Sequence, residues 1–282
     1  MEQAQRGHPT EGDGKGSRIV RLAGAVLLSL AFLGAGASAR ADNTPACSNA
    51  SARLKGQSAI PALAGKLSRH QPIRILAIGS SSTEGIGASS PDHTYPAQLE
   101  DDLAALWKEQ VAVVNAGKGG ETVVQTIERL EAALKADRYD LVIWQVGTND
   151  AINGVDESAF RALLDRGISA VRQAGTEMVL LDQQYFPSIK DLARYERFVN
   201  AVSVTGLDRK IGVFSRYALM KEWNSRSPEE LRSMLSADGF HMGDKGYDHL
   251  ADCMADALQA MVEHSVAEAR PTVTAVASVR DR

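Results

Sequence analysis

The chain has 282 residues, of which 44% are hydrophobic and 23% charged, a composition typical of a globular protein rather than a disordered one. Its 31 basic and 35 acidic residues give a net charge of −4, so no surplus of positive charge points to nucleic acid. The length suits one large domain or two small ones.

The first forty residues differ from the rest. Arg18 and Arg21 precede an apolar run over 22–36, and small residues follow, with an A-x-A pattern at 39–41. A positive stretch, a short apolar core and small residues are typical of a secretory signal peptide. The run is shorter than the about 20 residues of a membrane span. We therefore predict a signal peptide over 1–41 and a periplasmic or secreted mature protein without stable membrane insertion; an uncleaved anchor is the alternative.

After residue 72, short apolar runs alternate with longer stretches of helical periodicity. The runs resemble strands buried on both faces of a parallel sheet, and they occupy 73–78, 111–115, 141–146, 177–181 and 211–214. Apolar residues at steps of three and four mark helices near 96–106, 123–134, 160–171, 192–204 and 250–261. This alternation predicts a three-layer α/β/α sandwich with a five-stranded parallel sheet.

The boundaries of this domain follow from where the alternation starts and stops. The periodic part covers 72–265, and the segment 42–71 before it reads as an N-terminal extension. The tail over 266–282 has no periodicity, so we expect it to be disordered.

Polar loops follow the first three predicted strands, over 79–85, 117–122 and 147–150, and a fourth, over 238–241, follows the fifth strand after a helical insertion. Ligands of an open parallel sheet bind beyond the carboxyl ends of its strands, so these loops should meet at one edge. Together they hold serine, glycine, asparagine, aspartate and histidine. A hydroxyl nucleophile, a base, a group that orients the base and donors for an oxyanion are the parts of an acyl-transfer site.

The same loops resemble the sequence blocks of the SGNH (GDSL-like) hydrolase family. Gly-Ser-Ser at 79–81 resembles block I, usually Gly-Asp-Ser, and Gly120 falls on the glycine of block II. Asn149 falls on the asparagine of block III, and Asp-Gly-Phe-His at 238–241 matches the Asp-x-x-His of block V. The order and spacing agree over about 72–262. The resemblance implies an exported bacterial serine esterase with the flavodoxin-like SGNH fold.

The resemblance also implies a role for each residue. Ser81 is the nucleophile, His241 the base that takes its proton, and Asp238 the carboxylate that orients the imidazole. The N–H groups of Ser81 and Gly120 and the side-chain amide of Asn149 form the oxyanion hole. No cofactor is implied, and no histidine pair has the spacing of a metal site.

Three consecutive serines complicate the choice of nucleophile. Ser80 stands where the family usually has aspartate, which we interpret as a polar turn residue. The strand register and the family pattern favour Ser81 over Ser80 and Ser82.

The chain has only two cysteines, Cys47 and Cys253. Because the predicted export places them where thiols are oxidised, we predict a disulfide between them. The alternative is a free Cys253 buried as a small hydrophobic residue on the last helix.

The expected substrate is a small-acyl ester, such as an acetylated carbohydrate or another polar ester, so the partner is a small molecule or glycan. One alternative is a lysophospholipase or thioesterase of the same family, although no insertion rich in exposed apolar residues provides a lipid groove. A non-catalytic glycan-binding protein on the same fold is the other alternative. The triad Ser81, Asp238 and His241 is complete, which disfavours it.

Overall fold

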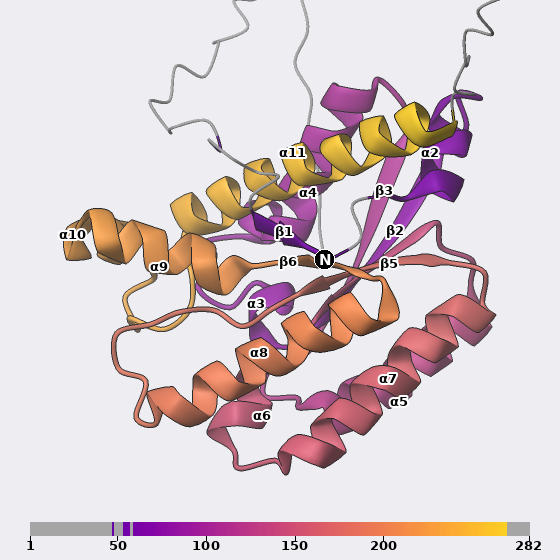
Figure 1. The fold of residues 1–282 in the computed structure, drawn as a ribbon. Coiled ribbons are helices and arrows are strands. Elements are labelled where there is room, and N and C mark those ends of the chain that lie inside the picture. The colour runs from indigo at the N-terminus through magenta and orange to yellow at the C-terminus, as the bar shows by residue number, and fades with distance from the viewer. Residues whose placement is uncertain (1–46, 48–52, 57–58, 270–282) are drawn as a thin grey trace, which may run out of the picture. The chain divides into compact units, whose positions relative to one another are not determined.

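The computed structural model describes Cys47, 53–56 and 59–269 (Figure 1). The predicted signal peptide over 1–41 lies outside these residues, as does 270–282, the larger part of the predicted tail.

A six-stranded sheet runs through the described domain in the order β1-β6-β5-β4-β2-β3. The five strands β2 to β6 run parallel to one another, as predicted. Strand β1 instead pairs antiparallel with β6, with Leu54 opposite Phe214. The prediction missed β1 because a strand of two residues carries no alternation. The strands are β1 (Leu54–Lys55), β2 (Ile73–Gly79), β3 (Val111–Gly117), β4 (Leu141–Gln145), β5 (Glu177–Leu181) and β6 (Gly212–Phe214).

Helices cover both faces of the sheet (Figure 1). One layer packs around Trp223 and Leu250 and includes α2 (Pro61–Leu67), α4 (Tyr95–Trp107), α9 (Arg216–Arg226), α10 (Pro228–Met234) and α11 (Asp244–Ala269). The other packs around Trp144 and Phe160 and includes α5 (Val123–Ala136), α7 (Glu157–Gln173) and α8 (Leu192–Arg209). Two short helices, α3 (Ser81–Glu84) and α6 (Thr148–Ile152), follow β2 and β4 directly, and a 3-10 turn, η1, covers Pro91–His93. None of the helices in the described ranges has the length and apolar character needed to cross a membrane.

The packed part of the chain is longer than the predicted 72–265. Helix α2 buries Leu63 and Ala64 in the same core as α11, and the carboxylate of Glu177 accepts the N–H groups of Ala62 and Leu63 at 2.9 Å each. Helix α11 continues to Ala269, past the expected start of the tail. Its last residues, 266–269, are exposed, which is why no apolar periodicity marked them in the sequence.

Cys47 and Cys253 form a disulfide that joins positions 206 residues apart, with their Cα atoms 5.0 Å from each other. Cys253 lies fully buried in α11, and Cys47 packs against the same core. The bond predicted from the sequence is therefore present, and it ties the start of the described chain to its last helix.

Candidate active site

The nucleophile position lies where β2 ends and α3 begins. The hydroxyl oxygen of Ser81 is 2.9 Å from Nε2 of His241. The hydroxyl of Ser80 donates to Oε1 of Gln145 at 3.1 Å, and that of Ser82 donates to Oε1 of Gln184 at 2.7 Å. Of the three serines, Ser81 alone directs its hydroxyl to the histidine.

The base and its orienting acid lie in the short turn before α11. Nδ1 of His241 is 2.6 Å from Oδ2 of Asp238. Oδ1 of Asp238 accepts the N–H of Phe240 at 2.8 Å, the N–H of His241 at 2.9 Å and the hydroxyl of Ser236 at 2.8 Å. Burial acts to raise the pKa of Asp238, but the bonds from His241, Phe240 and Ser236 outweigh it and hold that pKa well below its usual range. The carboxylate therefore stays ionised beside the imidazole, as an orienting acid must.

The loop 117–122, which follows β3 and which we call the oxyanion loop, lies against the nucleophile. A Cβ built on Gly119 would stand 3.7 Å from Cβ of Ser81. Most N–H groups of this loop are already engaged: that of Gly117 with Oδ1 of Asn115, that of Lys118 with the carbonyl of Gly79, that of Gly119 with Oε2 of Glu84, and that of Thr122 with Oε1 of Gln125. The N–H of Gly120 has no such partner within the described ranges.

Gly120 is suited to an open position beside a substrate. Its φ is +78°, which favours glycine, and a Cβ built there would meet no atom within 4 Å. The N–H of Ser81, the first residue of α3, also lacks an intrahelical partner, as at every helix start. Both N–H groups can therefore serve an oxyanion.

Asn149 provides the third candidate donor. It lies in α6, directly after β4, and its Nδ2 donates to the carbonyl of Glu121 at 2.8 Å. A carboxamide carries two N–H donors, so one is used to hold the side chain and the second remains for a substrate. The structure thus brings together all five residues that the sequence singled out for catalysis.

Two buried glutamines support the site, and the sequence analysis did not find them. Oε1 of Gln145, at the end of β4, accepts both the N–H (2.8 Å) and the hydroxyl of Ser80. Gln184 accepts the hydroxyl of Ser82 and donates to the carbonyl of Phe240 at 2.8 Å, so it joins the nucleophile helix to the turn that carries His241. A signal was present: Gln145 is polar in an otherwise apolar strand and lies at its carboxyl end.

A cavity of about 500 Å³ borders the site through Phe240, which precedes His241, and through Ala151, two residues after Asn149. Its wall is mainly apolar, and Ile152, Phe186, Ile189 and Tyr195 contribute to it. Within the described residues, no group of three or more His, Cys, Asp or Glu side chains could hold a metal ion.

Comparisons with known proteins identify the family of this chain. The model of the non-GDSL lipase-like family matches residues 46–268. A curated relative from Escherichia coli (strain K12), named thioesterase 1/protease 1/lysophospholipase L1, is 28% identical over 193 residues, covering 67% of this chain and 85% of the relative. The arylesterase of Vibrio mimicus is 25% identical over 115 residues, covering 41% of this chain and 56% of the relative.

Solved structures show the same fold. The acetyl xylan esterase AlAXEase superposes with a TM-score of 0.59 at 20% identity, covering 66% of this chain and 100% of that one. TesA superposes with a TM-score of 0.57 at 22% identity, covering 67% and 99%. The chain belongs to the non-GDSL lipase-like family, it has the fold of the SGNH (GDSL-like) esterases, and it is a carboxylic ester hydrolase.

Proposed function

We propose that the protein is an exported serine esterase that hydrolyses small-acyl esters, such as those of an acetylated carbohydrate or another polar ester. The observation that carries the catalytic part is the chain of contacts from Ser81 through His241 to Asp238, at 2.9 and 2.6 Å. A serine hydroxyl is a weak nucleophile until a base takes its proton, and this contact supplies the base.

The reaction follows from these contacts in two steps. His241 takes the proton of Ser81 as Oγ attacks the ester carbonyl, and the tetrahedral oxyanion is stabilised by the N–H groups of Ser81 and Gly120 and the amide of Asn149. The intermediate then collapses with cleavage of the ester C–O bond, and His241 gives its proton to the departing alkoxide. The alcohol leaves, and the acyl group stays on Oγ of Ser81. A water molecule that loses its proton to His241 attacks this acyl-enzyme, and collapse of the second intermediate returns the proton to Ser81 and releases the acid.

Export is supported by two separate features. The composition of 1–41 is that of a signal peptide, and the Cys47–Cys253 disulfide is a bond that persists mainly in oxidising compartments.

The main alternative, a lysophospholipase or thioesterase, is favoured by one specific observation. The apolar cavity beside Phe240 could take an acyl chain longer than acetyl. The Escherichia coli relative also bears the names of both activities.

Turnover of p-nitrophenyl acetate, octanoate and palmitate tests the proposal, with acetate release from acetylated oligosaccharides measured in parallel and Ser81→Ala as the background. We expect the highest kcat/KM for acetate, together with release from the oligosaccharides. A maximum at octanoate or palmitate would instead support the alternative. Absence of turnover at every chain length would indicate a non-catalytic glycan-binding protein.

A further inference from the structure

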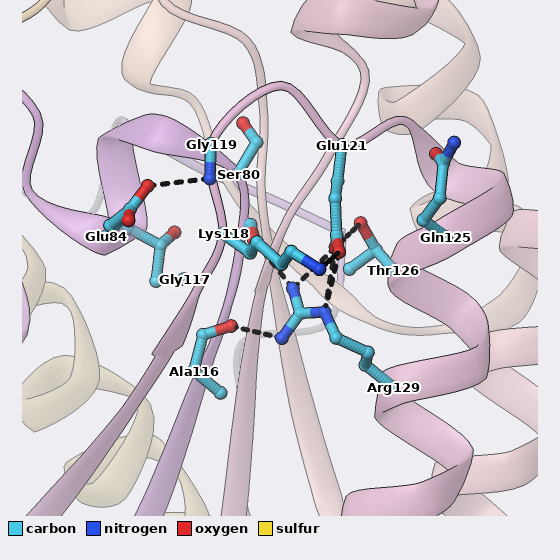
Figure 2. Close-up of polar contacts among 12 residues, drawn as sticks. Ser80, Glu84, Ala116, Gly117, Lys118, Gly119, Glu121, Gln125, Thr126 and Arg129 are labelled. Carbon is cyan, nitrogen blue, oxygen red and sulfur yellow. Dashed lines mark hydrogen bonds and ion pairs between the residues drawn. The ribbon is translucent and has the colours of Figure 1, made fainter.

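Arg129 links two strand ends at the edge of the sheet that carries the site (Figure 2). It lies in the second turn of α5 and reaches back over the start of that helix. Nη1 donates to the carbonyl of Ala116 at 2.7 Å, and Nη2 donates to the carbonyl of Gly79 at 3.1 Å. Gly79 ends β2, two residues before Ser81, and Ala116 precedes the oxyanion loop. One guanidinium therefore joins the strand that leads to the nucleophile to the strand that leads to that loop.

The same guanidinium binds Glu121, a residue of the oxyanion loop. Nε and Nη2 of Arg129 lie 2.8 and 2.7 Å from Oε2 of Glu121. The Glu121 side chain is only 8% exposed, whereas Lys118, whose Nζ is 3.7 Å from Oε1, is 68% exposed. Arg129 is thus the main partner of a largely buried carboxylate. A two-pronged guanidinium–carboxylate pair fixes orientation as well as distance.

Glu121 in turn fixes both candidate donors outside α3. Its main-chain carbonyl accepts the amide of Asn149 at 2.8 Å, and its peptide nitrogen is bonded to Gly120. The opposite side of the loop is held by the bond between the N–H of Gly119 and the carboxylate of Glu84, in the nucleophile helix. Movement of the Glu121 side chain would consequently displace both the N–H of Gly120 and the amide of Asn149.

Charge adds a second consequence. The carboxylate of Glu121 belongs to the residue next to Gly120, so without a partner it would oppose the negative charge that develops on the oxyanion. Removing one member of a buried ion pair leaves an uncompensated charge, which costs more than removing both.

We propose that the Glu121–Arg129 ion pair is the positioning element of the oxyanion hole, which holds Gly120 and Asn149 in register with Ser81 and neutralises the carboxylate beside them. Neither side chain is required to touch the substrate. This inference rests on the proposed active site.

The test compares Arg129→Met, Arg129→Lys, Glu121→Gln and the double variant Glu121→Gln/Arg129→Met. Arg129→Met should lower kcat roughly 10- to 100-fold with KM changed less than about threefold, because displaced donors act mainly in the transition state. Asn149→Ala, in which a donor is removed, should lose roughly 100- to 1,000-fold. The double variant should be faster than Arg129→Met, because it leaves no unpaired carboxylate. Arg129→Lys should recover only part of kcat, since an ammonium restores the charge but not the planar set of contacts.

Arg166→Met is the matched control. Arg166, in α7, makes an equally short pair of bonds, both 2.7 Å, to Glu131 on the same helix α5, but it has no contact with the oxyanion loop. The kcat values of both arginine variants are measured at a temperature below the start of their thermal unfolding transitions. We expect kcat of Arg166→Met to remain within about twofold of wild type.

Phosphorylation of Ser81 by diethyl p-nitrophenyl phosphate gives a second readout, since its transition state also places negative charge on an oxygen near these donors. The rate should fall in Arg129→Met together with kcat. Equal kcat values for Arg129→Met and Arg166→Met would overturn the inference. If Arg129→Met does not fold, Glu121→Gln takes its place in the test. A wild-type kcat in Glu121→Gln also overturns the inference. An active Ser81→Ala would show instead that the proposed active site itself is wrong.

Discussion

At the scale of single residues, Ser81, Ser80 and Ser82 are chemically identical and differ in what their hydroxyl groups already bond. Ser80 and Ser82 are committed to Gln145 and Gln184, both buried, whereas Ser81 faces His241. Removing the hydroxyl of Ser80 or Ser82 breaks one such hydrogen bond and lowers the free energy of unfolding by about 1 kcal/mol. It leaves the hydroxyl of Ser81 in place.

Ser81→Ala should therefore abolish ester hydrolysis with the fold retained, while Ser80→Ala and Ser82→Ala keep most of the activity. Initial rates on p-nitrophenyl acetate, with circular dichroism as the check on folding, distinguish the three. An inactive but folded Ser82→Ala would move the nucleophile by one residue.

The histidine base predicts a pH dependence of the rate. His241 must be neutral to accept the proton of Ser81, and the ionised Asp238 beside it favours the imidazolium formed in the transition state. We expect kcat/KM to fall as the pH is lowered from about 8 to about 5, the interval in which histidine side chains gain a proton. A flat profile over this interval, measured with the enzyme shown to be folded throughout, would count against a histidine base.

At the scale of elements, a buried carboxylate joins β5 to α9. Asp182 follows β5 directly; its Oδ2 accepts the hydroxyl of Ser215 at 2.6 Å and its Oδ1 accepts the N–H of Tyr217 at 2.8 Å. Burial raises the pKa of Asp182 to about 6, although these two bonds and the nearby Arg216 act in the opposite direction. The carboxyl group therefore holds its proton to higher pH in the folded chain than in the unfolded one, where the usual value is 3.8.

The sign of the stability effect follows from this difference. The contribution of Asp182 is complete below pH 3.8 and is lost as the pH rises through about 6. The free energy of unfolding of the wild type minus that of Asp182→Asn should thus fall between about pH 4 and pH 8, by at most about 3 kcal/mol. Urea unfolding of both proteins at the two pH values measures it. A difference that stays constant or rises with pH contradicts the assignment.

At the scale of the whole described domain, the Cys47–Cys253 disulfide closes a loop across 206 positions of sequence. In the chain-entropy account, a cross-link over so long a loop contributes up to about 5 kcal/mol by restricting the unfolded chain. The variant Cys47→Ser/Cys253→Ser should accordingly unfold at lower urea concentration than the wild type. Its kcat should be unchanged under folding conditions, because neither sulfur contacts the triad among the described contacts.

Intact mass of the protein, expressed from the full chain and alkylated under denaturing conditions, provides the covalent check. Without reductant we expect no alkylated thiol, and with reductant two. Two alkylated thiols in the unreduced sample would show that the bond does not form in the cell.

The sequence by itself determined the order of the strands along the chain, the layers and the loops in which the candidate catalytic residues lie. Burial on both faces leaves a continuous apolar run in each strand, such as 141–146. Polar residues that follow such a run mark the loop at the carboxyl end of the strand. The loops that hold Ser81 and Asn149 were found in this way, and the resemblance to the family's sequence blocks singled out the two residues within them. The turn that carries Asp238 and His241 is equally local.

Only the tertiary structure decided which groups support these residues. The partners of Gln184 and Arg129 lie in other elements, so no periodicity of their own segments reports them. Strand β1 escaped prediction for a related reason: its two residues are defined by pairing with β6 and not by any pattern in 54–55. Periodicity records how each element is buried, whereas the positioning of a catalytic site depends on hydrogen bonds and ion pairs between segments that meet only after the chain has folded.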